Sequence, residues 1–479
     1  MKKLFLVFVL VLFIAQFSQA QWEPDVRLTN ASDTSRTSYN GSWCVASSGD
    51  TVHVVWYDKR DANWEIFYKR STDGGLTWGA DTRLTNDLAM SSYPSIALSG
   101  PMVHIVWKDT RDGHSELYYK RSVDRGESWG NDIRLTNTPS YHVNLISVSS
   151  NGLWVHVLWA LNESPLGSSV IYYKNSADGG LTWEPETLLA SGSAYFPSVA
   201  SSGADVYVVW TDQRDGNFEI YFNHSADGGF SWSEETRLTD NLSVSFMPSI
   251  SISGSVVHVV WYDRRDYGLP EVYYKRSLDG GISWEEDTRL TFSESSASYF
   301  SNLTASGQVV HVVWEDNREG NFQIYYKRSD DVGENWGEET QLSENLGWSS
   351  NRPSVAVSGP AVHVVWYDSR DGNYEIYYKR NPTGNIIVGI ENDFAENTEQ
   401  SFTIYPNPAS SIIHIQFNDN PTGKSMLTIR NILGEILITS PIEKDKATVD
   451  VSTLPNGIYF MEIAMPNKQP ECRKLIIRK

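Results

Sequence analysis

A short apolar run that ends in tryptophan recurs seven times along the chain. Its commonest form is V-H-V-V-W, and successive copies are 51 to 53 residues apart. The tryptophans that end the seven runs are Trp56, Trp107, Trp159, Trp210, Trp261, Trp314 and Trp366. Repeats of this length are typical of solenoids, propellers and other arrays of one supersecondary unit. The pattern therefore predicts a repeat architecture.

Each repeat contains four short segments in which apolar and polar residues alternate, as they do in half-buried strands. In the second repeat these segments are Pro94–Gly100, Val103–Trp107, Glu116–Ser122 and Asp132–Thr136. Glycine, aspartate and asparagine separate them and provide turn signals. No stretch of the repeats has a sustained helical period. We therefore expect four strands in each repeat and an all-β fold.

The seventh repeat ends after its third segment and runs into Asn381–Gly384 without a fourth strand. A matching segment, Asp25–Thr29, stands before the first complete repeat. If residues 25–29 pair with the last repeat, the ring closes and leaves no free sheet edge between the first and last repeats. The sequence thus predicts a seven-bladed β-propeller over residues 21–381.

The beginning of the chain has the pattern of a cleavable secretory signal. Two lysines precede an apolar run from Leu4 to Phe17, and Ser18-Gln19-Ala20 supplies small residues before the expected cut. We predict a signal peptide over residues 1–20. Because the apolar run is shorter than a spanning helix needs, we expect no membrane-spanning segment in the protein after cleavage.

A different domain is predicted after a polar linker at residues 382–401. Residues 402–479 contain Y-P-N-P at Tyr405–Pro408, N-G-I-Y at Asn456–Tyr459 and a basic last strand. This segment resembles the C-terminal sorting domain of the type IX (Por) secretion system. The resemblance implies a small β-sandwich that engages the type IX secretion machinery, so that the protein passes through the periplasm and is secreted or attached to the outer surface. From the residues alone, an accessory β-sandwich that binds carbohydrate remains open.

The charge of the chain limits its partners. The sequence has 59 acidic and 39 basic residues. Without Lys2, Lys3 and the segment from Asn385 onward, 48 acids and 28 bases remain, so the repeats carry a net charge near −20. Such a surface repels phosphate backbones and makes nucleic acid an improbable partner. The only cysteines are Cys44 and Cys472, which excludes a disulfide framework.

A second motif, S-x-D-x-G-x-x-W, lies between the third and fourth segments of six repeats. It resembles the Asp box (BNR repeat) of sialidase-like β-propellers. Sialidases of the best-known kind have six blades, so the resemblance concerns the blade. Aspartate can accept hydrogen bonds from turn amides, and glycine permits a positive φ. We therefore predict a structural role for the six aspartates, Asp73, Asp124, Asp178, Asp227, Asp279 and Asp331.

The loop between the second and third segments carries an Asp-x-Arg-Asp (or Asp-x-Arg-Glu) motif in every repeat except the third, which has Ala160–Glu163. Its arginines are Arg60, Arg111, Arg214, Arg265, Arg318 and Arg370. In one interpretation each arginine pairs with an aspartate and braces the hairpin. In the other, the arginines form a ring that faces an anionic ligand. Both remain open from the sequence.

Aromatic residues precede the first strand in nearly every repeat, where a propeller has the mouth of its central channel. The candidate ligand-binding residues there are Tyr93, Tyr141, Tyr195, Phe246 and Tyr299, with Arg352 in the seventh repeat. Such rings either cap the inner strands or form a platform for a sugar or a peptide. We predict that any ligand binds on this face.

Two functions follow from these observations. The first is a secreted or cell-surface propeller without catalytic activity that binds a glycan or a surface protein. The alternative is a sialidase-like exo-glycosidase, which would need three arginines, a tyrosine with a glutamate partner, and an acid/base aspartate. The R-I-P signature of that family is absent, and the candidate arginines, tyrosines and glutamates all occupy repeated positions. We therefore assign no catalytic residue, and we predict neither a metal site nor a cofactor.

Overall fold

The computed structural model describes residues 22–385 and 402–477, apart from short gaps. The gaps are residues 39–42, 139–141, 163–168, 267, 294, 345–346, 406–408, 418–424, 431–435, 443–445, 456 and 465–470. The chain divides into two compact units, Met1–Ile387 and Val388–Lys479. The predicted signal peptide, residues 1–20, and most of the predicted linker lie outside the described residues.

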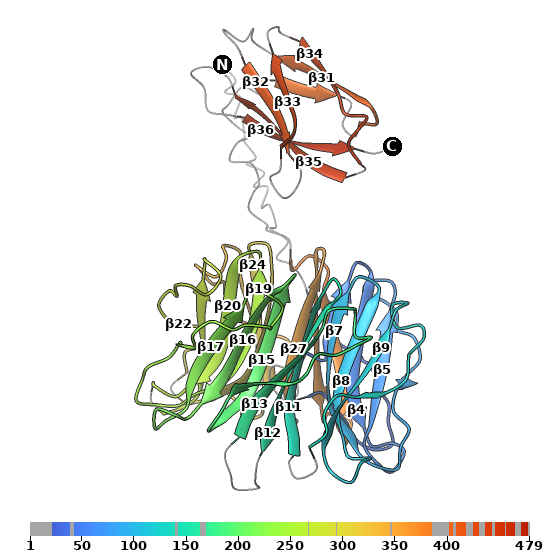
Figure 1. The fold of residues 1–479 in the computed structure, drawn as a ribbon, viewed down its shortest axis with the longest axis vertical. Helices are drawn as coiled ribbons and strands as arrows, with labels where there is room; N and C mark the ends of the chain where they lie inside the picture. Colours follow the sequence, from blue (N-terminus) through green and yellow to red (C-terminus); the bar gives the residue numbers. More distant parts are fainter. Residues whose placement is uncertain are drawn as a thin grey trace, which may run out of the picture. The chain divides into compact units, whose positions relative to one another are not determined.

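The first unit consists of seven antiparallel sheets, the blades, which are coloured from blue to brown in Figure 1. The first strands are β3 (Val45–Ser48), β7 (Ser91–Ser99), β11 (His142–Asn151), β15 (Ala194–Ser202), β19 (Ser245–Ser253), β23 (Ser298–Ser306) and β27 (Ser350–Ser358). The second strands are β4 (Thr51–Asp58), β8 (Met102–Asp109), β12 (Trp154–Asn162), β16 (Asp205–Asp212), β20 (Val256–Asp263), β24 (Val309–Asp316) and β28 (Ala361–Asp368).

The outer half of each blade has one long strand and one short strand. The third strands are β5 (Glu65–Ser71), β9 (Glu116–Ser122), β13 (Ser169–Ser176), β17 (Glu219–Ser225), β21 (Glu271–Ser277), β25 (Gln323–Ser329) and β29 (Glu375–Asn381). The fourth are β6 (Thr82–Arg83), β10 (Ile133–Arg134), β14 (Thr187–Ala190), β18 (Thr236–Arg237), β22 (Thr288–Arg289), β26 (Thr340–Gln341) and, in blade seven, β1 (Val26–Arg27). Blade one has an additional short strand, β2 (Ser35–Arg36), paired with β4.

Successive first strands pack against each other, and β27 of blade seven packs against β3 of blade one. The seven sheets therefore close into a ring, and the predicted seven-bladed propeller is confirmed. No helix occurs among the described residues.

The interior of each blade is built on the repeated second strand. All seven of its tryptophans are 0% exposed. In blade two, Trp107 lies 6.0 Å from Tyr118 of the third strand, centroid to centroid. On the opposite face, His104 Nδ1 hydrogen-bonds the Tyr119 hydroxyl at 2.8 Å, and burial lowers the pKa of His104 to about 3. Because side chains alternate between the faces of a strand, each sheet buries both faces against its neighbours.

The N-terminal segment completes blade seven. In β1, Val26 pairs with Tyr378 and Arg27 with Tyr377. Trp22 packs edge-on against Tyr326 of blade six, with centroids 4.9 Å apart. This contact repeats the one that the tryptophan of each Asp box makes with the preceding blade. Residues 22–29 therefore act as the second half of a seventh box followed by its fourth strand.

Part of the predicted linker contacts the propeller. Asn385 Nδ2 donates to the carbonyl of Gly359 at 2.7 Å, and Asn385 Oδ1 lies 3.0 Å from His311 Nε2. Residues 382–385 therefore extend the first unit beyond the boundary that the sequence suggests.

The second unit is a small β-sandwich. One sheet has the order β30 (Phe402–Tyr405), β31 (Ile412–Phe417), β34 (Lys446–Asp450), and the other has β33 (Ile436–Ile442), β32 (Ser425–Arg430), β35 (Gly457–Ala464), β36 (Glu471–Ile477). In β31, Ile413 and Ile415 are buried whereas Ile412 and His414 are exposed, as alternation requires. The inner faces form one apolar core, which includes Met461. This domain agrees with the predicted fold class.

Candidate functional site

The six Asp-box aspartates accept hydrogen bonds from residues of their own turns. Asp227 Oδ1 accepts hydrogen bonds from the Ser231 amide at 2.9 Å and the Ser225 hydroxyl at 2.8 Å, and Oδ2 accepts one from the Ser231 hydroxyl at 2.6 Å. The bonds from Ser231 and Ser225 lower the pKa of Asp227 to about 2. The same bonds recur at Asp73, Asp124, Asp178, Asp279 and Asp331. They support the structural interpretation of the box.

Each box also joins its blade to the preceding one. Trp232 packs edge-on against Tyr173 with centroids 5.0 Å apart. Gly229 has a φ of +92°, and a Cβ there would lie 2.2 Å from the Tyr173 hydroxyl oxygen. The second glycine of the box is therefore required by both backbone conformation and close packing.

The arginines of the Asp-x-Arg loops are held in ion pairs. In blade two, Arg111 Nη2 lies 2.6 Å from Asp109 Oδ2, and Arg111 Nη1 lies 2.8 Å from Asp132 Oδ2. Its guanidinium also covers the ring of Tyr118 at 4.5 Å. Equivalent pairs hold Arg60, Arg214, Arg265, Arg318 and Arg370. These contacts favour the bracing alternative over a ring of arginines that faces a ligand.

The candidate residues at the channel mouth, which we call the rim residues, occupy two different positions. Each first strand from blade two to blade seven contains a β-bulge with one non-glycine residue at positive φ. Tyr93 and Arg352 are such bulge residues, whereas Tyr195, Phe246 and Tyr299 directly precede the bulge. A bulge redirects side chains, so the two groups differ in direction. Tyr141 lies outside the described residues.

The aromatic rim residues are half-buried and pack against rings of the second-to-third loops. Phe218 lies 6.0 Å from Tyr195 and 4.8 Å from Phe246 between ring centroids. Tyr299 lies 6.0 Å from Phe322. The rim therefore caps the loops, and part of each ring remains accessible to a ligand.

The strongest departure from the repeat lies directly after the second-strand tryptophan, and sequence reasoning missed it. The seven residues at this position are Tyr57, Lys108, Ala160, Thr211, Tyr262, Glu315 and Tyr367. They contact the first strand of the next blade. Thr211 Oγ1, for example, accepts a hydrogen bond from the Met247 amide at 3.0 Å. The variation at an otherwise repeated position was visible in the sequence and could have identified this ring.

Blades six, seven and one bring two arginines, two tyrosines and one glutamate of this region together. We call Arg36, Tyr57, Glu315, Arg352 and Tyr367 the mouth cluster. Glu315 is 3% exposed and accepts a hydrogen bond from the Arg352 amide at 2.9 Å. Burial raises the pKa of Glu315 to about 7, against the opposing effect of Arg352.

The two tyrosines of the mouth cluster share the same electrostatic environment. Burial raises the pKa of Tyr367 to about 12, while Arg352 and Arg36 lower it and Glu315 raises it. Burial likewise raises the pKa of Tyr57. Both tyrosines are more than nine-tenths buried, whereas Arg36 and Arg352 are half-buried.

Arg36 is the member of the mouth cluster that is best placed to bind. Its guanidinium covers the rings of Tyr374 at 5.0 Å and Trp64 at 5.7 Å. Its Nε is buried and has no hydrogen-bond partner among the described residues. A buried donor without an acceptor is costly, and a ligand oxygen would satisfy it.

Among the described residues, no three His, Cys, Asp or Glu side chains are grouped so that they could hold a metal ion. In the same residues, no helix is long and apolar enough to cross a membrane.

The C-terminal unit is identified by comparison with protein families. Residues 403–478 match the secretion system C-terminal sorting domain. The chain is therefore exported through the type IX route and is secreted or attached to the outer surface. No curated protein sequence matches the chain.

The propeller resembles solved structures of carbohydrate-active proteins. A PL25 ulvan lyase in complex with -[GlcA(1-4)Rha3S]- is 11% identical, with a TM-score of 0.52, over 74% of this chain and 95% of its own. A second PL25 ulvan lyase structure is 11% identical, with a TM-score of 0.51, over 73% and 94%. The sialidase of Trypanosoma rangeli is 11% identical, with a TM-score of 0.44, over 80% and 83%. At these identities the similarity shows the fold alone.

Proposed function

We propose that this protein is an exported propeller without catalytic activity that binds a carbohydrate or a protein at the channel mouth. The mouth cluster carries this proposal, because Arg36, Glu315 and Arg352 there depart from the residues at the matching positions of the other blades. Arg36 offers a buried donor without a partner among the described residues, and the half-buried rings of Tyr195, Phe246 and Tyr299 offer stacking surfaces. The acidic repeats disfavour a large polyanion, so a neutral or weakly charged ligand fits best.

The burial of the mouth cluster supports binding over hydrolysis. A sialidase-like exo-glycosidase would need an acid/base aspartate beside a tyrosine and its glutamate partner. The mouth cluster contains no aspartate, and its one carboxyl group, that of Glu315, is 3% exposed. A sialidase-like exo-glycosidase is the second candidate function, because Glu315 has a pKa near 7 and interacts with Tyr367.

We further propose an organisation for the whole chain. Residues 1–20 are a signal peptide, residues 21–381 the propeller with Asp boxes, residues 382–401 the linker and residues 402–479 the sorting domain. The pairing of β1 with β29 supports the propeller boundaries, and the family match at 403–478 supports the start of the last domain.

A glycan array with the full chain, followed by titration of the best binder, tests the proposal. We expect Arg36→Ala and Arg352→Ala each to weaken binding at least about tenfold, which corresponds to about 1.4 kcal/mol. Phe230→Ala is the matched control, because Phe230 is 63% exposed in an Asp box on the opposite face. Unchanged affinity in both arginine variants would contradict the mouth as the binding site.

A fluorogenic sialoside assay separates the two candidate functions. We expect no hydrolysis by the wild-type chain. Turnover that Glu315→Gln abolishes would establish the glycosidase instead.

A further inference from the structure

Blade one contains an insertion inside its first strand. Arg36 pairs with Tyr57 at the same level as Ser92 with Lys108 in blade two, and Val45 pairs with Val54 as Ile96 does with Ile105. Arg36 and Val45 are nine positions apart, whereas Ser92 and Ile96 are four apart. Blade one therefore has five additional residues between these two positions, and Trp43 belongs to this stretch.

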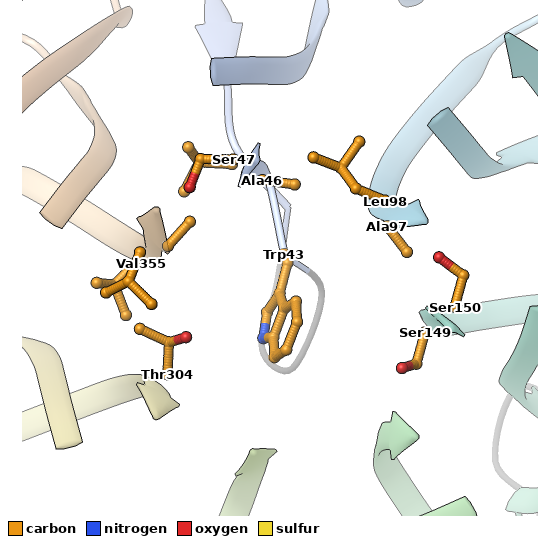
Figure 2. A pocket seen from close by; sticks show the side chains of 12 residues that line it. Trp43, Ala46, Ser47, Ala97, Leu98, Ser149, Ser150, Thr304 and Val355 are labelled. Atoms are coloured by element: carbon orange, nitrogen blue, oxygen red, sulfur yellow. The ribbon is translucent and has the colours of Figure 1, made fainter. Parts of the chain in front are cut away.

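The insertion places an indole in the central channel. Figure 2 shows Trp43 projecting into the space between the first strands, with Ser47, Leu98 and Ser149 around it. The cavity at this point has a volume of about 150 Å³. Its lining includes Trp43, Ser47, Leu98, Ser149 and Ser150. Among the described residues, Trp43 is the only aromatic one that lines it.

The described residues that line this channel cavity are uncharged, but some of their polar atoms make no hydrogen bond. Trp43 Nε1, Ser47 Oγ and Ser150 Oγ are buried atoms without a hydrogen-bond partner among the described residues. Ser149 Oγ, in contrast, bonds Ser201 Oγ at 2.8 Å. Buried donors and acceptors without partners cost free energy, and here three of them line one cavity beside an aromatic face.

The channel cavity opens toward the Asp-box face. Ser47, Leu98 and Ser150 are half-buried, whereas Val45, nearer the mouth, is buried. The turns that follow the first strands bond the Asp boxes: the Gly74 amide, for example, donates to the carbonyl of Asp50 at 2.7 Å. This opening is therefore on the face opposite the mouth cluster.

We propose that the channel cavity binds one neutral pyranose ring against Trp43. Benzene fills an apolar cavity of about 150 Å³, and a hexopyranose has twice as many heavy atoms, so the cavity takes one edge of the sugar ring while the rest extends through its opening. An indole presents a flat apolar surface with one N–H donor, and a pyranose presents an apolar face surrounded by hydroxyl groups. The hydroxyls of Ser47 and Ser150 can pair with those of the sugar. Since no charged side chain lines the cavity, an ionised sugar would lose its hydration without gaining a counter-charge.

This site is separate from the proposed ligand site at the mouth and goes beyond it. A test therefore uses monosaccharides, which are small enough to enter the channel. Saturation-transfer NMR of the full chain is measured with D-glucose, D-galactose, L-rhamnose and L-fucose, and with D-glucuronic acid as the charged probe. We expect saturable binding of at least one neutral pyranose and weaker binding of the glucuronate.

Two substitutions locate the bound sugar. Trp43→Ala should weaken binding about tenfold through the loss of the stacking partner. Ser150→Ala removes the hydroxyl and adds no atom to the cavity, and it should also weaken binding, so it decides the question if Trp43→Ala fails to fold. Trp348→Ala, at a 48% exposed tryptophan, is the matched control. The double variant Tyr195→Ala/Tyr299→Ala at the mouth should leave this binding unchanged.

Three outcomes would overturn the proposal. If none of the four neutral pyranoses saturates, the cavity holds only water. If a sugar binds equally well to the Ser150→Ala and Trp43→Ala variants, it binds elsewhere. If glucuronate binds as well as the neutral sugars, the assigned ligand class is wrong.

Discussion

The Asp-box face and the channel mouth are built on the same seven blades, but their residues repeat to different degrees. On the Asp-box face, one set of hydrogen bonds recurs in six boxes. At the mouth, the residue after the second-strand tryptophan is a tyrosine, lysine, alanine, threonine or glutamate. Folding a ring of similar blades needs the repeated residues. The positions that depart from the repeat are not fixed by this requirement, and the proposed binding site uses them.

Removing residues 22–30, the N-terminal segment that closes the ring, should have the largest effect on the free energy of unfolding. This deletion breaks the repeated pattern where blade seven meets blade one. Deletion of residues 22–30 removes Arg27 and Thr29, both of which bond the fully buried carboxylate of Glu375. Leaving a buried charge without its partners costs roughly 3–5 kcal/mol. Urea denaturation of the full-length and deleted chains measures the difference.

Truncation of residues 402–479 is the control for this deletion, because the second unit has its own core. The truncated chain should keep the urea midpoint of the propeller. An unchanged midpoint in the 22–30 deletion would show that β1 is dispensable.

The Glu315→Gln variant tests the mouth cluster through the pH dependence of the free energy of unfolding. The folded-state pKa of Glu315, about 7, exceeds the ordinary value of 4.5. The folded state therefore binds the proton more tightly than the unfolded state, and the free energy of unfolding decreases as the pH rises from about 4.5 through 7. The variant should lose this dependence and be more stable than wild type at pH 8, by up to about 3 kcal/mol.

Thermal unfolding at pH 5 and pH 8 checks this expectation. Glu286→Gln, at an exposed glutamate of the same propeller, should unfold as the wild type does. If the difference in stability between Glu315→Gln and wild type is the same at pH 5 and at pH 8, Glu315 does not titrate between these pH values.

Gly229→Ala probes the repeated face. The added Cβ meets Tyr173 of the preceding blade at 2.2 Å, and the φ of +92° is already unfavourable for alanine. Gly216→Ala is the matched control, since its φ is +99° but nothing lies within 4 Å. We expect Gly229→Ala to cost about 1–3 kcal/mol more than the control, through overpacking alone. Equal urea midpoints for the two variants would contradict the role of the box in joining blades.

The double variant Tyr195→Ala/Tyr299→Ala should have the smallest effect on stability and a clear effect on binding. Both side chains are half-buried at the rim. We expect at least tenfold weaker binding of the mouth ligand, about 1.4 kcal/mol, with an unchanged circular dichroism spectrum. Normal affinity would mean that these rings only cap the loops.

Much of the fold could be predicted because each blade repeats its own signals. The apolar run that ends in Trp107 predicts the second strand, and the box at Ser122–Trp129 predicts the turn that follows the third strand. The role of Trp22 was not recognised, since its half-motif stands alone at the beginning of the propeller. Spacing alone did not show which blade its ring would contact.

The candidate site could be predicted only in part. Tyr93 and Tyr195 were aligned as equivalent, but a β-bulge separates their positions, and a bulge leaves no clear mark in a single sequence. Arg352 was identified because it replaces an aromatic residue. Glu315 and Trp43 were missed because the first looks like ordinary variation in a strand and the second lies in an insertion.

The closure of blade seven also sets the order in which this molecule can mature. Asn373 hydrogen-bonds the carbonyl of Ala31 across 342 residues of sequence. Contacts between such distant residues form late, because nearly the whole chain must be in place before they can be made. During export the N-terminal partner emerges first and must wait for blade seven. Until blade seven has crossed, β1 has no partner strand, and chaperones or neighbouring chains can act on its unpaired edge.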